Sequence, residues 1–145
     1  SRYRIFSQGD LMLERTKTIL VNAVVIAVIS ILLFAGATQF RQWSQFNRGE
    51  HALAAGDHIN AVAGFESAIH MYTPFSPLVE RSAQKLWAIG QELESRGESE
   101  KALIAYRALR SAFYSTHGLV RPGMNWIALC DEKIGLLAKP VLPAR

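Results

Sequence analysis

The sequence contains one uncharged apolar stretch, residues 18–40 (TILVNAVVIAVISILLFAGATQF), without Asp, Glu, Lys, Arg or Pro. The hydrocarbon core of a bilayer, about 30 Å thick, needs about 20 apolar residues in a helix to cross it. A helix also satisfies its own backbone polar groups where water is absent. We therefore predict one transmembrane helix at 18–40. A buried core helix is the alternative, and a cleaved signal peptide is disfavoured because the apolar part is too long.

The charges on either side of this stretch indicate an orientation. Residues 1–17, a basic arm, carry four basic and two acidic residues, whereas the matching window after the stretch carries only Arg41 and Arg48. The positive-inside rule then predicts a cytoplasmic N-terminus and a C-terminal domain across the membrane. Residues 41–145 carry twelve basic and ten acidic residues without a basic stripe, so no nucleic-acid partner is expected.

Small and polar residues gather on one side of the predicted span. At about 100° per residue, this side carries Asn22, Ala23, Ala27 and Ser30. Small residues let helices approach closely, and Asn or Ser can hydrogen-bond between them. We predict that this side packs against other transmembrane subunits and that the lipid bilayer surrounds the rest. A passive anchor is the alternative.

The remaining chain contains an internal repeat. A set of glycine, small and aromatic residues recurs after 41 residues with unchanged internal spacing. An early glycine would let two helices cross closely, a second would permit a positive φ in a turn, and the later residues would form an apolar helix face. The pattern predicts two helical hairpins. The first copy is Gly49, Gly56, Ala61, Phe65 and Ala68, and the second is Gly90, Gly97, Ala102, Tyr106 and Leu109.

These spacings resemble the tetratricopeptide repeat, a helix pair of about 34 residues. The two units would cover residues 42–75 and 83–116. The first departs from the family pattern at Gln45 and Arg48, where an aromatic residue and Leu are usual. The resemblance implies an all-α protein: the transmembrane helix, then a short solenoid over 41–138 with two repeats and a C-terminal capping helix. A generic helical-hairpin array without true repeat geometry is the alternative.

Turn and cap residues predict the helix boundaries. Asp57 and Ser99 are suited to cap the second helix of each hairpin. Ser76 and Pro77 are suited to begin the first helix of the second hairpin, with Ser as its cap. The helix before it should end near residue 71, because a proline follows at 74. Between residues 40 and 55 there is no proline, so the membrane helix is expected to continue unbroken into the first hairpin.

The last helix is predicted at residues 124–138, followed by a tail at 139–145. Asp131, Glu132 and Lys133 are expected on its solvated side. Its apolar residues would cover the open end of the second repeat, as a terminal repeat must in a short solenoid. These residues are Met124, Ile127, Ala128, Ile134, Leu137 and Ala138.

No arrangement typical of an enzyme occurs in the sequence. It lacks a phosphate-binding glycine loop, a nucleophile elbow and a zinc-protease motif. The four carboxylates in residues 92–100 are expected to pair with Arg96 and Lys101 on a solvated face, and the four histidines to be exposed. Cys130 is expected to be a small buried residue. We therefore predict no catalytic, cofactor-binding or metal-ligating residues.

The resemblance implies protein–protein interaction. In tetratricopeptide proteins the first helix of each repeat lines the binding groove, and the matching residues are Gln84, Trp87, Gln91 and Glu94. Trp87 equally suits the core, and we favour that role. A single span followed by such a domain resembles the accessory subunits of bacterial inner-membrane complexes, in which the domain lies in the periplasm. A non-catalytic, membrane-anchored subunit that docks a protein partner is implied. The alternatives are a homo-oligomeric membrane scaffold and an accessory subunit of a transport or proton-driven motor machine.

Overall fold

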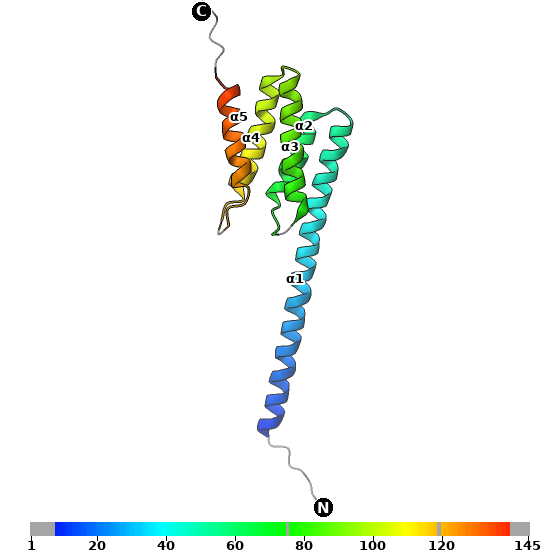
Figure 1. The fold of residues 1–145 in the computed structure, drawn as a ribbon. Coiled ribbons are helices and arrows are strands. Elements are labelled where there is room, and N and C mark those ends of the chain that lie inside the picture. The colour runs from blue at the N-terminus through cyan, green and yellow to red at the C-terminus, as the bar shows by residue number, and fades with distance from the viewer. Residues whose placement is uncertain (1–7, 75, 119, 140–145) are drawn as a thin grey trace, which may run out of the picture. The chain divides into compact units, whose positions relative to one another are not determined.

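A computed structural model describes residues 8–74, 76–118 and 120–139 of the chain. These residues form five helices and no strand, so the all-α prediction is confirmed (Figure 1). The predictions for residues 1–7 of the basic arm, for Phe75 and for residues 140–145 of the tail lie outside the described residues. The helices are α1 (Gln8–Ala54), α2 (His58–His70), α3 (Pro77–Ser95), α4 (Ser99–Ser115) and α5 (Met124–Leu137).

The chain divides into two compact units, Ser1–Ala37 and Thr38–Arg145, and their boundary falls inside α1. In the first unit every described residue, from Gln8 to Ala37, is exposed. At the start of α1, Thr16 and Thr18 donate their hydroxyl protons to the carbonyls of Met12 and Glu14, one turn earlier. The helix runs without a break through residues 40–54, which confirms the predicted continuity.

The second unit consists of antiparallel helices joined by short turns. Residues 38–54 of α1 pair with α2, α3 pairs with α4, and α5 packs on α4. The α2 and α4 helices also contact each other. Gly56 and Gly97 have φ values of 75° and 76° in the two hairpin turns, a conformation that costs glycine little. The two predicted hairpins and their turn glycines are confirmed.

A glycine packed against an aromatic ring fixes the crossing in both hairpins. A Cβ at Gly49 would lie 2.9 Å from the Phe65 ring, and one at Gly90 would lie 2.6 Å from the Tyr106 ring. In the first hairpin a Cβ at Gly64 would also lie 2.7 Å from the Cα of Gly49. The early glycine of each copy therefore serves the predicted purpose. The side chains of Phe65 and Tyr106 are fully buried in one continuous core.

A buried glutamine holds the link between the hairpins. The side chain of Gln42, which is fully buried, donates its amide protons to the carbonyls of Ala68 (2.9 Å) and Met71 (3.1 Å). Its amide oxygen accepts the hydroxyl proton of Ser76 at 2.6 Å. The last carbonyls of a helix have no partner inside the helix. Gln42 therefore supplies donors at the end of α2 and ties them to the start of α3.

The predicted caps are confirmed in part. The carboxylate of Asp57 accepts the Asn60 backbone N–H at 3.1 Å and caps α2. The Ser99 prediction is wrong, because Glu98 occupies the cap position and Ser99 is the first helical residue. Ser76 does occupy the cap position of α3, before Pro77, but its hydroxyl makes no capping bond. It bonds to Gln42 instead, which is why that cap is missing.

The α5 helix covers the second hairpin with only some of the apolar residues expected to face it. Trp126, Ile127 and Cys130 are buried, and Ile134 and Leu137 pack against the core at their edges. The covering role predicted for this helix is confirmed. The expectation for Met124, Ala128 and Ala138 is wrong, because all three are exposed. At about 100° per residue, Met124 and Ala128 point away from Trp126 and Cys130. Ala138 follows the last residue of the helix, as its C-cap.

Candidate interaction surface

The predicted partner-binding residues all lie on α3, and the structure separates them into two pairs. Gln84 and Gln91 are exposed, in a row with Ala88 and Ser95 along one side of the helix. Gln84 donates an amide proton to Glu80 at 3.3 Å. We call this row the α3 row. Its two amide side chains carry hydrogen-bond donors and acceptors on the exposed surface.

Trp87 belongs to the aromatic packing between α3, α4 and α5. Its ring centroid lies 5.0 Å from that of Tyr106 and 6.0 Å from that of Trp126. The side chain is half-buried against the core. The core role favoured for Trp87 is therefore confirmed. Contact between the exposed edge of Trp87 and a second protein stays a prediction.

Glu94 takes part in contacts within the domain. Its carboxylate accepts protons from Lys133 Nζ at 2.9 and 3.0 Å and from the Tyr106 hydroxyl at 2.9 Å. The bonds from Lys133, and then the bond from Tyr106, hold the pKa of Glu94 below its ordinary value. Burial, and then the bond to Glu94, raises the pKa of Tyr106. Lys133 is half-buried here, so its predicted place on the solvated side is wrong.

Polar contacts flank the α3 row on both sides. On the α1 side, Lys85 Nζ lies 2.8 Å from a Glu50 carboxylate oxygen, and the Arg81 guanidinium lies 4.9 Å from the centre of the Phe46 ring. On the α5 side, the Trp126 indole N–H donates to Glu80 at 3.1 Å. These contacts join α3 to α1 and α5. Sequence reasoning missed them because their members are far apart in the chain.

The predicted transmembrane contacts remain predictions. Asn22, Ala23, Ala27 and Ser30 are all exposed on α1. They share one side of the helix at about 100° per residue. The helix is long and apolar enough to cross a membrane, a criterion that a signal sequence near an N-terminus also meets.

A small apolar hollow lies near the two hairpin turns, where α2 and α4 begin. It is lined by His58, Ile59, Val62, Leu93, Lys101 and Ile104. His58 is half-buried, with Nε2 4.0 Å from a Glu92 oxygen, and His117 is also half-buried. The expectation of exposed histidines is correct for His51 and His70 and wrong for these two. The hollow is shallow, and its wall is almost entirely apolar.

Among the described residues no group of three or more His, Cys, Asp or Glu side chains could hold a metal ion. Cys130 is fully buried, and burial raises the pKa of its thiol to about 12, so the thiolate nucleophile is not formed near neutral pH. Arg96 pairs with Glu92 and Lys101 with Glu98, as predicted for this carboxylate cluster.

No family model, no curated protein and no solved structure matches this chain.

Proposed function

We propose that this chain is a non-catalytic, membrane-anchored interaction subunit. The observation that carries the proposal is the exposure of every residue of α1 from Gln8 to Ala37. Leu, Ile, Val and Phe side chains dominate residues 19–34 of this part of the helix. In water such an exposed apolar surface is unfavourable at roughly 25 cal/mol for each Å². In lipid the same surface is stabilised, and a span of about 20 residues meets the thickness of the hydrocarbon core.

The proposed membrane is the bacterial inner membrane, with the N-terminus cytoplasmic and the helical domain periplasmic. The support is the excess of basic residues in the arm before the apolar stretch, together with the resemblance to tetratricopeptide proteins. The glycine–aromatic crossings at Gly49–Phe65 and Gly90–Tyr106 support a repeat of that kind. The proposal for the domain is that it docks or stabilises a protein partner through the α3 row. Gln84 and Gln91 would contribute amide hydrogen bonds.

The proposal is tested by chemical crosslinking of the full chain in its native membranes, followed by mass spectrometry. An interaction subunit gives crosslinks to different membrane proteins. A ladder of identical copies alone would favour a homo-oligomeric scaffold instead. Release of the full chain from membranes by alkaline carbonate would overturn the membrane anchor itself.

The predicted packing side of the span is tested with two substitutions on opposite sides of the helix. Ala27→Leu enlarges the side that also carries Asn22 and Ser30, whereas Val21→Leu changes an apolar residue on the opposite side. Both variants should insert normally, because each keeps an apolar side chain. Ala27→Leu should weaken co-purification with the crosslinked membrane protein, and Val21→Leu should not. Equal recovery in both variants would contradict packing through this side.

A further inference from the structure

Two loops lie at the same end of the helical domain as residues 38–45. The Gln42 hydrogen bonds to Ala68, Met71 and Ser76 place the α2–α3 link beside the start of this unit. The bond from Trp126 to Glu80 joins the first turns of α5 and α3, which brings the α4–α5 link to that end as well. The same arrangement is visible in Figure 1. We call this end the entry end, because the chain enters the domain there from the apolar stretch.

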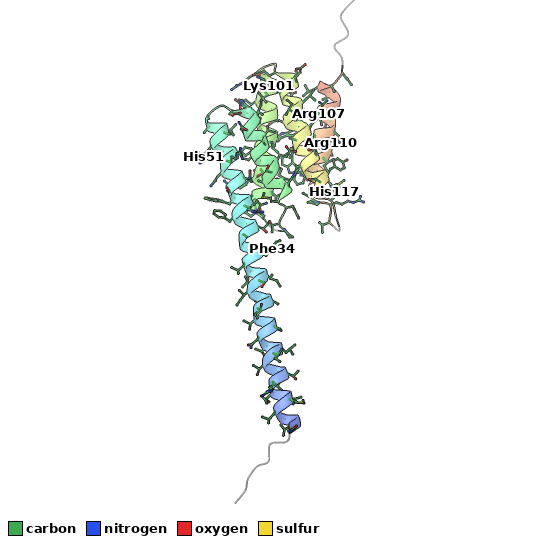
Figure 2. The ribbon with its side chains drawn as sticks, turned by 180° about the vertical axis from the view of Figure 1, so that it is seen from behind. Phe34, His51, Lys101, Arg107, Arg110 and His117 are labelled. Atoms are coloured by element: carbon green, nitrogen blue, oxygen red, sulfur yellow. The ribbon has the colours of Figure 1, made fainter. Side chains whose placement is uncertain are left out.

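The two hairpin turns lie at the opposite end, which we call the turn end. There Glu94, near the end of α3, meets Lys133 of α5. Figure 2 shows Lys101 near one end of the domain and His117 near the other. Lys101 follows the second hairpin turn, and His117 lies in the α4–α5 link. The ends can therefore be compared as two separate surfaces.

The entry end exposes large apolar side chains. Phe40 is 67% exposed, Trp43 is 52% exposed and Val120 is 65% exposed. The rings of Phe40 and Trp43 lie side by side with centroids 6.1 Å apart. Aromatic side chains at the end of an apolar span are typical of the membrane–water interface. Val120 comes from a distant part of the sequence and belongs to the same end of the domain.

The two ends also differ in charge. At the entry end, residues 38–45, 71–81 and 114–124 contain three arginines and a single acidic residue, Glu80, whose carboxylate accepts the Trp126 indole proton. At the turn end, residues 54–61, 91–102 and 133–139 contain five acidic and four basic residues. Arg41 and Arg121 are exposed at the entry end. Basic residues within a Debye length of an anionic leaflet are attracted to it.

We propose that the entry end of the domain rests on an anionic bilayer surface, with Val120 and the Phe40–Trp43 pair at headgroup depth. Arg41 and Arg121 bind lipid phosphates there, and the turn end, which has no excess of basic residues, faces the aqueous compartment. The inference builds on the proposed membrane anchor. It adds a second contact with the membrane, made by residues more than seventy positions beyond the apolar stretch.

A nitroxide label on the full chain tests this contact. Val120→Cys places the label at the entry end, and Ser99→Cys places a matched, exposed label at the turn end. Cys130 can stay in both variants because it is fully buried, and the unsubstituted chain shows whether it takes any label. Accessibility to oxygen, which partitions into lipid, is compared with accessibility to a water-soluble nickel chelate. The samples are detergent micelles, phosphatidylcholine vesicles and vesicles that also contain phosphatidylglycerol.

In phosphatidylglycerol vesicles the label at residue 120 should gain oxygen access and lose nickel access severalfold, while the label at residue 99 should keep its values from detergent. Replacing Arg41 and Arg121 together by Gln should reverse much of the change, as should high salt. A residue-120 label as open to nickel as the residue-99 label would overturn the inference. An equal change in pure phosphatidylcholine vesicles would overturn the proposed preference of the entry end for anionic lipid.

The outcome is distinguishable from failure of the proposed function. Alkaline carbonate extraction is carried out on the same vesicles. A chain that stays in the membrane while residue 120 remains in water keeps its anchor and loses only the surface contact. A chain that is extracted loses both the anchor and the contact.

Discussion

Gly90 and Tyr106 are in such close contact that a Cβ at residue 90 would lie 2.6 Å from the Cε1 atom of the ring. Tyr106 has no room to retreat, because its side chain is fully buried and its hydroxyl is bonded to Glu94. The same glycine–aromatic pair recurs 41 residues earlier as Gly49 and Phe65. Helix pairs cross closely in both hairpins because neither glycine carries a side chain.

The first prediction concerns this contact. Gly90→Ala should lower the free energy of unfolding by about 1–3 kcal/mol, since the added methyl group overpacks the core. The measurement is urea unfolding of the full chain in detergent, followed by tryptophan fluorescence. Gly135→Ala is the control: nothing lies within 4 Å of its new Cβ, and alanine favours a helix by up to about 1 kcal/mol. Equal stability changes in the two variants would contradict the close crossing.

The second prediction concerns the hydrogen bonds of the Gln42 side chain. Gln42→Leu leaves the carbonyls of Ala68 and Met71 without their amide donor, so unfolding should become easier by about 2–3 kcal/mol. Ser76→Ala removes one hydrogen bond and should cost about 1 kcal/mol. Because Gln42 and Ser76 are bonded, the double variant should lose less stability than the sum of the single losses. Strictly additive losses would show that the two side chains act independently.

The third prediction concerns acid stability. Lys133 and Tyr106 favour the ionised carboxylate, so the pKa of Glu94 is lower in the folded chain than in the unfolded chain. Glu94 therefore stabilises the fold above the ordinary pKa of a glutamate, about 4.3. This contribution is lost as the pH falls through the lower folded-state pKa. Glu94→Gln should reduce stability at pH 7 and flatten the decline in acid.

The measurement is a series of urea titrations between about pH 3 and pH 7, a range that contains the ordinary glutamate pKa. Glu132→Gln, an exposed change on α5, is the matched control and should follow the unsubstituted chain at every pH. A Glu94→Gln curve parallel to that of the unsubstituted chain would mean that Lys133 and Tyr106 do not stabilise the carboxylate.

The fourth prediction concerns the lone thiol. Cys130 is fully buried, and burial raises its pKa to about 12, so a maleimide reagent at neutral pH meets neither an accessible sulfur nor a thiolate. Alkylation of the native chain should therefore be slow and should accelerate in parallel with urea unfolding. Mass spectrometry of samples quenched at set times gives the rate. Fast alkylation without denaturant would show that α5 opens readily from the domain.

Much of the architecture follows from local patterns. The glycine set at 41-residue spacing predicts two hairpins, and Gly56 and Gly97 adopt the positive φ that their turns require. Asp57 caps α2 because a carboxylate at that position reaches the backbone N–H groups of the first turn. These features depend on residues within one hairpin or one turn. A single sequence therefore contains the information needed to predict them.

The features missed depend on residues distant in the chain. Ser76 was expected to cap its own helix, but Gln42 lies nearby in the fold and takes its hydroxyl proton. Lys133 was expected in solvent, but Glu94, on another helix, holds it half-buried. A polar side chain has several possible partners of similar strength, and only the packed fold selects one. No pattern in the sequence signals either choice.

The place of Gln42, two residues after the apolar stretch, has a practical consequence. A fragment of the helical domain that begins at Trp43 would lack the Gln42 amide, which links the end of α2 to the start of α3. Peptidase removal of the stretch as a leader would leave an intact product only if the cut fell upstream of residue 42. The boundary of a working soluble fragment is therefore set by this one side chain and not by the edge of the hydrophobic run.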